Sequence, residues 1–230
     1  NGVKQSEKFF SNSSIKKIDF QKIQKHGIQA IQLILEVEED VAERKGSEIK
    51  KAITDSIQNI GLSEKAKIFS ESCIDTLISS ESKIHGIPED SVHLHEASSI
   101  NTFVDIVGIT IALEDLGLFD EKILCLPISV GGGSITFSHG TMSNPASAIL
   151  EIFKNSNLTI KGNTVNEELT TPTGACILVN LTNNAVEYYP SMKIDSIGYG
   201  AGQKDFETFS NVLKIVRGPE NNFNIDSVKI

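Results

Sequence analysis

Two histidines and a glutamate stand close together near the middle of the chain. His93, His95 and Glu96 belong to a Val-His-Leu-His-Glu stretch in which apolar and polar residues alternate. Alternate side chains of an extended strand project from one face, so both imidazoles would lie on the same side. Imidazole and carboxylate bind nickel, zinc and related metals. The stretch predicts a metal site; a pair of hydrogen-bonded histidines at a strand end remains the alternative.

The run that follows, residues 100–116, is almost entirely apolar and long enough for a buried helix of four to five turns. A stripe of small or polar residues follows helical spacing along it: Ser98, Asn101, Asp105, Gly108 and Ala112. A carboxylate in such a helix is costly unless a cation or donors meet it. We therefore expect the Asp105 face to meet a ligand, a metal or a close backbone.

Two further segments have the composition of anion sites. In Thr170-Thr171-Pro172-Thr173-Gly174, Thr171 is a candidate N-cap and Pro172 a first helical residue, so hydroxyls, free amides and the helix dipole converge. The Gly131-Gly132-Gly133 triplet could cradle a phosphate with backbone amides, although most such triplets are tight turns. The candidate phosphate-binding residues are Thr170, Thr171, Thr173, Gly174, Gly132 and Gly133.

His139 precedes Gly140 shortly after the glycine triplet. It is a candidate third metal ligand or proton carrier, and a turn residue is the ordinary interpretation. The three cysteines are far apart, which indicates reduced thiols and a cytoplasmic protein. A net charge of −9 without a basic cluster argues against nucleic-acid binding, and no segment indicates export or membrane insertion.

The remaining patterns predict the elements that position these residues. Strands are expected at 15–20, 28–37, 123–130, 135–140, 192–199 and 212–216, with helices at 47–60, 63–85, 145–153 and from 172. The fold class is therefore α+β, a mixed sheet with a helical hairpin and a buried central helix, not a regular doubly wound sheet. We expect a flexible arm (1–13), strands plus hairpin (14–90), a motif-bearing core (91–218) and a tail (219–230) in one compact unit.

Five motifs occur in an order that resembles the LarC-type nickel-insertion proteins. They are V-H-L-H-E with F-V-D-I-V-G, G-G-G followed by H-G, E-L-T-T-P-T-G-A, G-Y-G-A-G, and N-V-L, and the resemblance runs from about residue 15 to 218. It implies a cytoplasmic chelatase, a lyase, that inserts Ni²⁺ into a phosphorylated pyridinium bis-thiocarboxylate during nickel-pincer cofactor biosynthesis. Mn²⁺ and CTP are implied for the complete protein.

On the positions that match, our own physical assignment makes His93, His95 and Glu96 metal ligands or proton acceptors. Asp105 and His139 would support the reaction, and the threonines and Gly174 would hold the substrate phosphate. Asn101 stands where the family has an aspartate, and the family's opening motif and CTP-binding domain lie outside this sequence. We therefore expect the central region of a longer architecture. A homo-oligomer, or N- and C-terminal segments on another chain, are the partner arrangements left open.

Two other functions remain open at this stage. One is a non-catalytic, divergent paralogue that binds a metal or nucleotide. The other is a zinc-dependent hydrolase, for which the His-x-His pair would serve, although no Asp-x-His companion is present.

Overall fold

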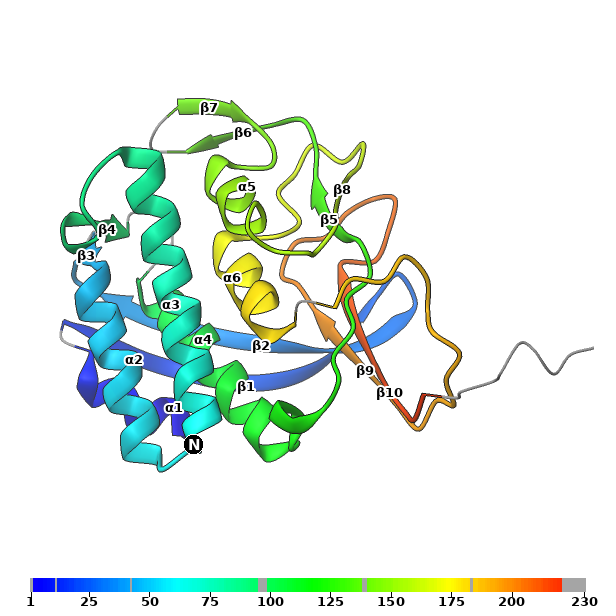
Figure 1. Ribbon diagram of the computed structural model, residues 1–230, viewed down its shortest axis with the longest axis horizontal. Coiled ribbons are helices and arrows are strands. Elements are labelled where there is room, and N and C mark those ends of the chain that lie inside the picture. Colours follow the sequence, from blue (N-terminus) through cyan, green and yellow to red (C-terminus); the bar gives the residue numbers. More distant parts are fainter. Residues whose placement is uncertain are drawn as a thin grey trace, which may run out of the picture. The chain divides into compact units, whose positions relative to one another are not determined.

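The structure is a computed structural model that describes residues 2–10, 12–41, 43–94, 99–137, 140–182 and 184–220. His95, Glu96 and His139 lie outside these ranges. Contacts divide the chain into two compact units (Figure 1): unit 1 comprises Asn1–Ser14 and Glu38–Glu187, and unit 2 comprises Ile15–Val37 and Tyr188–Ile230. The segment boundary expected between residues 90 and 91 therefore falls inside unit 1.

Unit 1 carries the described α-helices. They are α1 (Gly2–Gln5), α2 (Gly46–Ile60), α3 (Glu64–His85), α4 (Ser99–Asp115), α5 (Ser147–Phe153) and α6 (Pro172–Leu181). Single 3-10 turns occur at η1 (Ser6–Phe9), η2 (Glu89–Ser91) and η3 (Leu118–Asp120). α3 packs against α2, α4, α5 and α6 and is the central helix of the unit.

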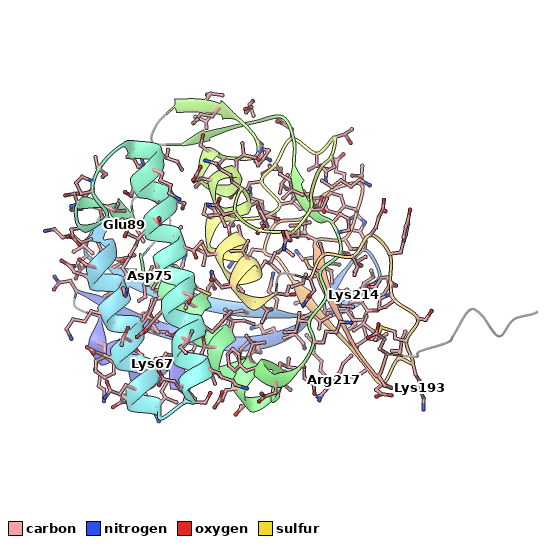
Figure 2. The ribbon with its side chains drawn as sticks, in the orientation of Figure 1. Lys67, Asp75, Glu89, Lys193, Lys214 and Arg217 are labelled. Atoms are coloured by element: carbon pink, nitrogen blue, oxygen red, sulfur yellow. The ribbon has the colours of Figure 1, made fainter. Side chains whose placement is uncertain are left out.

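The predicted helical hairpin of α2 and α3 is confirmed, and Figure 1 shows the two helices side by side. Gly61 ends α2 in the left-handed conformation with φ 80°, which a residue without Cβ adopts at no steric cost. Ser63 caps α3 by accepting a hydrogen bond from the Ala66 N–H. Asp75, labelled in Figure 2, pairs with Lys50 at 2.7 Å and links the two helices on their solvent side.

α4 is the buried helix predicted from the apolar run. Phe103, Ile106 and Val107 are fully buried, whereas Asn101, Asp105 and Ala112 of the predicted stripe are exposed. The helix therefore has one thin polar side, as its spacing indicates.

The N-terminal residues, expected to be a loosely held arm, pack on this helix instead. Val3 and Phe10 are buried, and the Phe10 ring lies 5.1 Å from the Phe103 ring. A Cβ at Gly108 of α4 would lie 3.8 Å from Val3. These apolar contacts explain why residues 2–9 form helical turns despite their polar composition.

The strands of unit 1 form three short pairs. β3 (Arg44–Lys45) is antiparallel to β4 (His93–Leu94), β5 (Ile128–Gly131) is parallel to β8 (Ile160–Gly162), and β6 (Ser134–Phe137) is antiparallel to β7 (Gly140–Ser143). The strand expected at 123–130 begins only at Ile128, and the helix expected at 145–153 begins at Ser147, two residues after Pro145.

Unit 2 is a four-stranded sheet in the order β1-β2-β9-β10. Its strands are β1 (Ser13–Lys25), β2 (Ile28–Glu39), β9 (Ser196–Ala201) and β10 (Val212–Arg217). β2 and β9 are parallel, and β9 and β10 are antiparallel. The sheet is therefore mixed, and with the hairpin and the buried helix it confirms the predicted α+β class.

The Gly-Tyr-Gly-Ala-Gly segment (residues 198–202) lies mainly in a strand, although its three glycines favour a turn. Its first four residues lie in β9, where Gly198 and Gly200 oppose Ile215 and Leu213 of β10. Cross-strand pairing, which the local sequence does not reveal, overrides the tendency of glycine to form turns. Within the residues that the structure describes, no helix combines the length and apolar character needed to cross a membrane.

Candidate functional site

The first candidate ligand, His93, lies on the two-residue strand β4. Lys45 of β3 is its cross-strand partner, and Gly46 N–H donates to the Val92 carbonyl at 2.9 Å, which extends the ladder. The His93 side chain is 35% exposed, and its Nδ1 atom is buried. Its Nδ1 lies 3.5 Å from Oε1 of Glu43, a residue of the acidic stretch that precedes β3.

α4 begins only five residues after β4. The chain can extend by no more than about 17 Å between Leu94 and Ser99, so His93 is tied to the N-terminal end of α4. His95 and Glu96 are the predicted partners of His93. Both lie in the part of this connection that is outside the described residues. Whether the three side chains meet at one metal therefore stays a prediction.

The starts of α4 and α6 meet at a pair of buried hydroxyls. Thr102, in the first turn of α4, and Thr173, the second residue of α6, are 1% and 6% exposed, and their hydroxyl oxygens lie 3.3 Å apart. Each helix N-terminus carries a partial positive charge. The junction therefore places two such charges side by side, at the end of α4 that follows His93.

The predicted start of α6 is confirmed, and its threonines have structural partners. The Thr170 hydroxyl donates to the Ser129 carbonyl of β5 at 2.8 Å. Thr171 is the N-cap and accepts from the Gly174 N–H at 3.1 Å. The Ala175 N–H donates to the Thr171 carbonyl. Pro172 has no N–H, so Thr173 supplies the one uncommitted amide of this turn among the described residues.

The glycine triplet packs against residues 163–168. Gly132 N–H donates to the Val165 carbonyl at 2.9 Å, and a Cβ at Gly132 would overlap the Asn163 carbonyl oxygen. The Asn144 side-chain amide holds the same region by donating to the carbonyls of Val130 and Glu167 at 3.1 and 2.7 Å. Glycine is needed here for close backbone packing, and the Gly132 amide is already used. A role of Gly132 and Gly133 in phosphate binding stays a prediction.

These contacts nevertheless bring the candidate phosphate segments together. Thr170 is bonded to β5, the strand that leads into the glycine triplet, and Gly131 forms a bridge with Glu168. In unit 1, residues 163–170 therefore contact the glycine triplet and lead directly into the start of α6.

Asp105 lies on the exposed side of α4, two turns from its start. The protein packed around it desolvates the carboxylate and raises the pKa of Asp105 to about 6. No hydrogen bond or ion pair holds this carboxylate among the residues described. Asp105 is therefore a candidate proton acceptor near neutral pH.

The fit of a metal was tested on the described side chains. Among them, no three His, Cys, Asp or Glu residues are grouped closely enough to hold an ion. The cysteines are free thiols, and burial raises the pKa of Cys73 and Cys176 well above the usual range, so both are ordinary core residues. A metal at His93 would need ligands from outside the described ranges or from a substrate.

Two residues of this region were missed by sequence reasoning. Thr102 is embedded in the apolar run of α4, where nothing marked it as different from its neighbours. Glu43 is 50 residues from His93 in the sequence, so no local pattern connects the two. Pairing of β3 with β4 brings it to His93.

A family described as nickel insertion proteins matches residues 3–230. The pyridinium-3,5-bisthiocarboxylic acid mononucleotide nickel insertion protein of Staphylococcus epidermidis is 38% identical over 214 residues, covering 93% of this chain and 52% of that protein. The protein of the same name from Geobacillus kaustophilus is 37% identical over 210 residues, covering 89% and 50%. A putative nickel insertion protein of Methanosphaera stadtmanae is 42% identical over 147 residues, covering 64% and 36%.

No solved structure matches the chain. The chain spans about half the length of the curated relatives it matches. The family match extends over nearly all of its residues and includes the His93 strand, α4 and the start of α6. The chain therefore belongs to the nickel insertion protein family.

Proposed function

We propose that the chain takes part in inserting nickel into a pyridinium bisthiocarboxylic acid mononucleotide, as the names of its relatives state for those proteins. The observation that carries the proposal is the junction of α4 and α6. It joins the helix that follows His93 to the helix start with the composition of a phosphate site. A metal ligand that is one short connection away from an anion-binding helix start suits a substrate that has a phosphate and metal-binding sulfur.

The junction also supports binding of the phosphate. Two hydroxyls contain two hydrogens, but the Thr102–Thr173 contact uses only one of them. The second hydrogen has no acceptor among the described residues, and a buried donor without an acceptor is costly. A phosphate oxygen at the paired helix starts would accept this hydrogen and the Thr173 N–H.

Nickel is the substrate metal in this proposal. The resemblance to the LarC-type proteins implies a bond between nickel and a ring carbon. Forming that bond releases the proton of the carbon, so the reaction needs a base. Asp105, with its pKa raised to about 6, is one candidate on α4, and His139 is the other. His93, His95 and Glu96 would hold nickel before transfer to the sulfur atoms of the substrate.

One second candidate is a module that binds metal or nucleotide without completing the reaction, and Asn101, which stands where the family has an aspartate, favours it. Half of each long relative lies outside the aligned region, and Mn²⁺ and CTP would act in the complete protein. We place either activity in the cytoplasm, because the three separate cysteines are free thiols.

The test is a direct insertion assay with the 230-residue chain. The mononucleotide and Ni²⁺ are mixed with the protein, with and without CTP and Mn²⁺, and the product is followed by absorption and mass spectrometry. Product that depends on the wild-type protein and falls with Asp105→Asn supports insertion. Substrate binding without product supports the binding module. If the chain shows no substrate binding and forms no product, both candidate functions are contradicted.

A further inference from the structure

The contact between Glu43 and His93 has a consequence for how the histidine can bind metal. Lys45 of β3 pairs with His93 of β4, and Glu43 stands two residues before Lys45. The Glu43 carboxylate faces Nδ1 of His93, with 3.5 Å between Oε1 and the ring nitrogen. The two side chains are 47% and 35% exposed, so both can adjust.

The backbone that carries Glu43 is firmly held. The neighbouring Arg44 is buried, and its guanidinium lies 4.3 Å from the centre of the Phe10 ring. One guanidinium nitrogen donates to the Ser13 hydroxyl at 2.6 Å, and Nε lies 3.5 Å from Oε1 of Glu39. Glu43 is therefore presented by an anchored strand start.

A carboxylate oxygen only accepts hydrogen bonds, so a ring nitrogen that bonds to it must carry a hydrogen. For neutral His93 this gives the Nδ1–H tautomer and leaves the lone pair on Nε2, on the far side of the ring from Glu43. Metal-binding histidines are commonly held in this way by a carboxylate on their other nitrogen. A separation of 3.5 Å is longer than a hydrogen bond, and such contacts often shorten when the ligand is bound.

We propose that Glu43 is a positioning residue that holds His93 in the Nδ1–H tautomer and so presents Nε2 to nickel. The inference rests on the proposed function for the identity of the metal. Glu43 acts through His93 and does not itself bind the metal. It supplies a carboxylate near the site from a segment unrelated in sequence to the His-x-His-Glu motif.

The tautomer can be measured without any metal. Nitrogen-15 NMR of the metal-free, 230-residue chain, at a pH well above the ordinary histidine pKa of about 6.5, distinguishes the two ring nitrogens. The chain has five histidines, and His93→Ala identifies the His93 signals by their loss. We expect Nδ1–H in the wild type and Nε2–H in Glu43→Ala.

Glu89→Ala is the matched control. Glu89 is exposed, lies in η2 of unit 1 four residues before His93, and is labelled in Figure 2. The substitution removes the same charge and the same side chain, and the tautomer should stay Nδ1–H.

The same variants are then titrated with nickel. Loss of an orienting carboxylate commonly weakens metal binding about 10- to 100-fold, so we expect this for Glu43→Ala and less than about threefold for Glu89→Ala. An unchanged tautomer in Glu43→Ala would overturn the inference, and a simultaneous loss of affinity would then mark Glu43 as a direct ligand. A changed tautomer with unchanged affinity would also overturn it. Failure of the wild type to bind nickel would instead contradict the proposed function, while the tautomer result still reports on Glu43.

Discussion

Replacing Thr102 by valine tests whether the junction of α4 and α6 depends on its hydroxyl pair. Valine has nearly the shape of threonine, so the change removes the hydroxyl and little packing. Thr102 is 1% exposed and Thr173 is 6% exposed in the ligand-free chain, so little water is available to replace the lost partner. In Thr102→Val the Thr173 hydroxyl stays buried, and its only hydrogen bond among the described residues is lost.

The expected cost follows from that uncompensated hydroxyl. Leaving a buried polar group without its partner costs about 1–3 kcal/mol, whereas replacing both partners by apolar groups of the same shape is nearly neutral. The 3.3 Å separation is long for two hydroxyls, so we expect the lower half of this range, about 1–2 kcal/mol, for each single variant. Thr102→Val/Thr173→Val should lose less than the sum of the two by about 1 kcal/mol or more.

Urea unfolding followed by far-ultraviolet circular dichroism measures these changes, because the described α-helices all belong to unit 1. The double variant should also bind the mononucleotide more weakly, since it lacks both hydroxyls at the proposed phosphate site. Additive losses in the double variant would refute the reasoning that the two hydroxyls act as a pair.

Three further predictions concern other parts of the molecule. Asp105→Asn should be more stable than the wild type at pH 7 by up to about 1 kcal/mol, after allowing for solvent near the side chain. The raised pKa of Asp105 makes ionisation unfavourable in the folded state, so this difference should vanish as pH falls from about 6 to below 3.8. Urea unfolding at a series of pH values measures it. Gly132→Ala should lower the melting temperature, because the added Cβ would overlap the Asn163 carbonyl oxygen. Gly198→Ala should change the melting temperature little, because its Cβ meets nothing within 4 Å. A Gly132→Ala variant that loses ligand binding at full stability would contradict this packing role of Gly132. Lys25→Ala should make residues 203–205 more mobile, because the buried Lys25 ammonium binds the Gln203 carbonyl at 3.2 Å and the Asp205 carboxylate at 2.5 Å. Faster amide hydrogen exchange in residues 202–211 is the expected result, and unchanged exchange there would contradict the prediction.

Local capping made much of the fold predictable. Gly61 ends α2, Ser63 caps the start of α3, and Thr171-Pro172 begin α6. Each acts on backbone groups a few residues away, so these helix ends could be inferred from the sequence. The strand content of Gly198–Ala201 depends on β10, and the helical turns of residues 2–9 depend on α4. These partners are distant in sequence, so local patterns could not identify them.

The candidate site shows the same limit. His93 and the α6 start were found because their residue types are unusual at that spacing. Glu43 and Thr102 were missed because each acquires its role from a residue that folding brings close, 50 and 71 positions away. The glycine triplet has the composition of a phosphate cradle, but in the structure it packs directly against carbonyl oxygens of residues 163–168.

The most direct test of the central claim is a nickel titration of the metal-free chain and of a His93→Ala/His95→Ala double variant, with manganese and zinc as comparison metals. Calorimetry gives the affinity and stoichiometry, and absorption reports the ligands around nickel. The proposed function predicts micromolar, one-to-one nickel binding by the wild type that is lost in the double variant. Equal, weak binding by both proteins would contradict a metal site at His93 and leave the family relationship without a nickel-handling role for this chain.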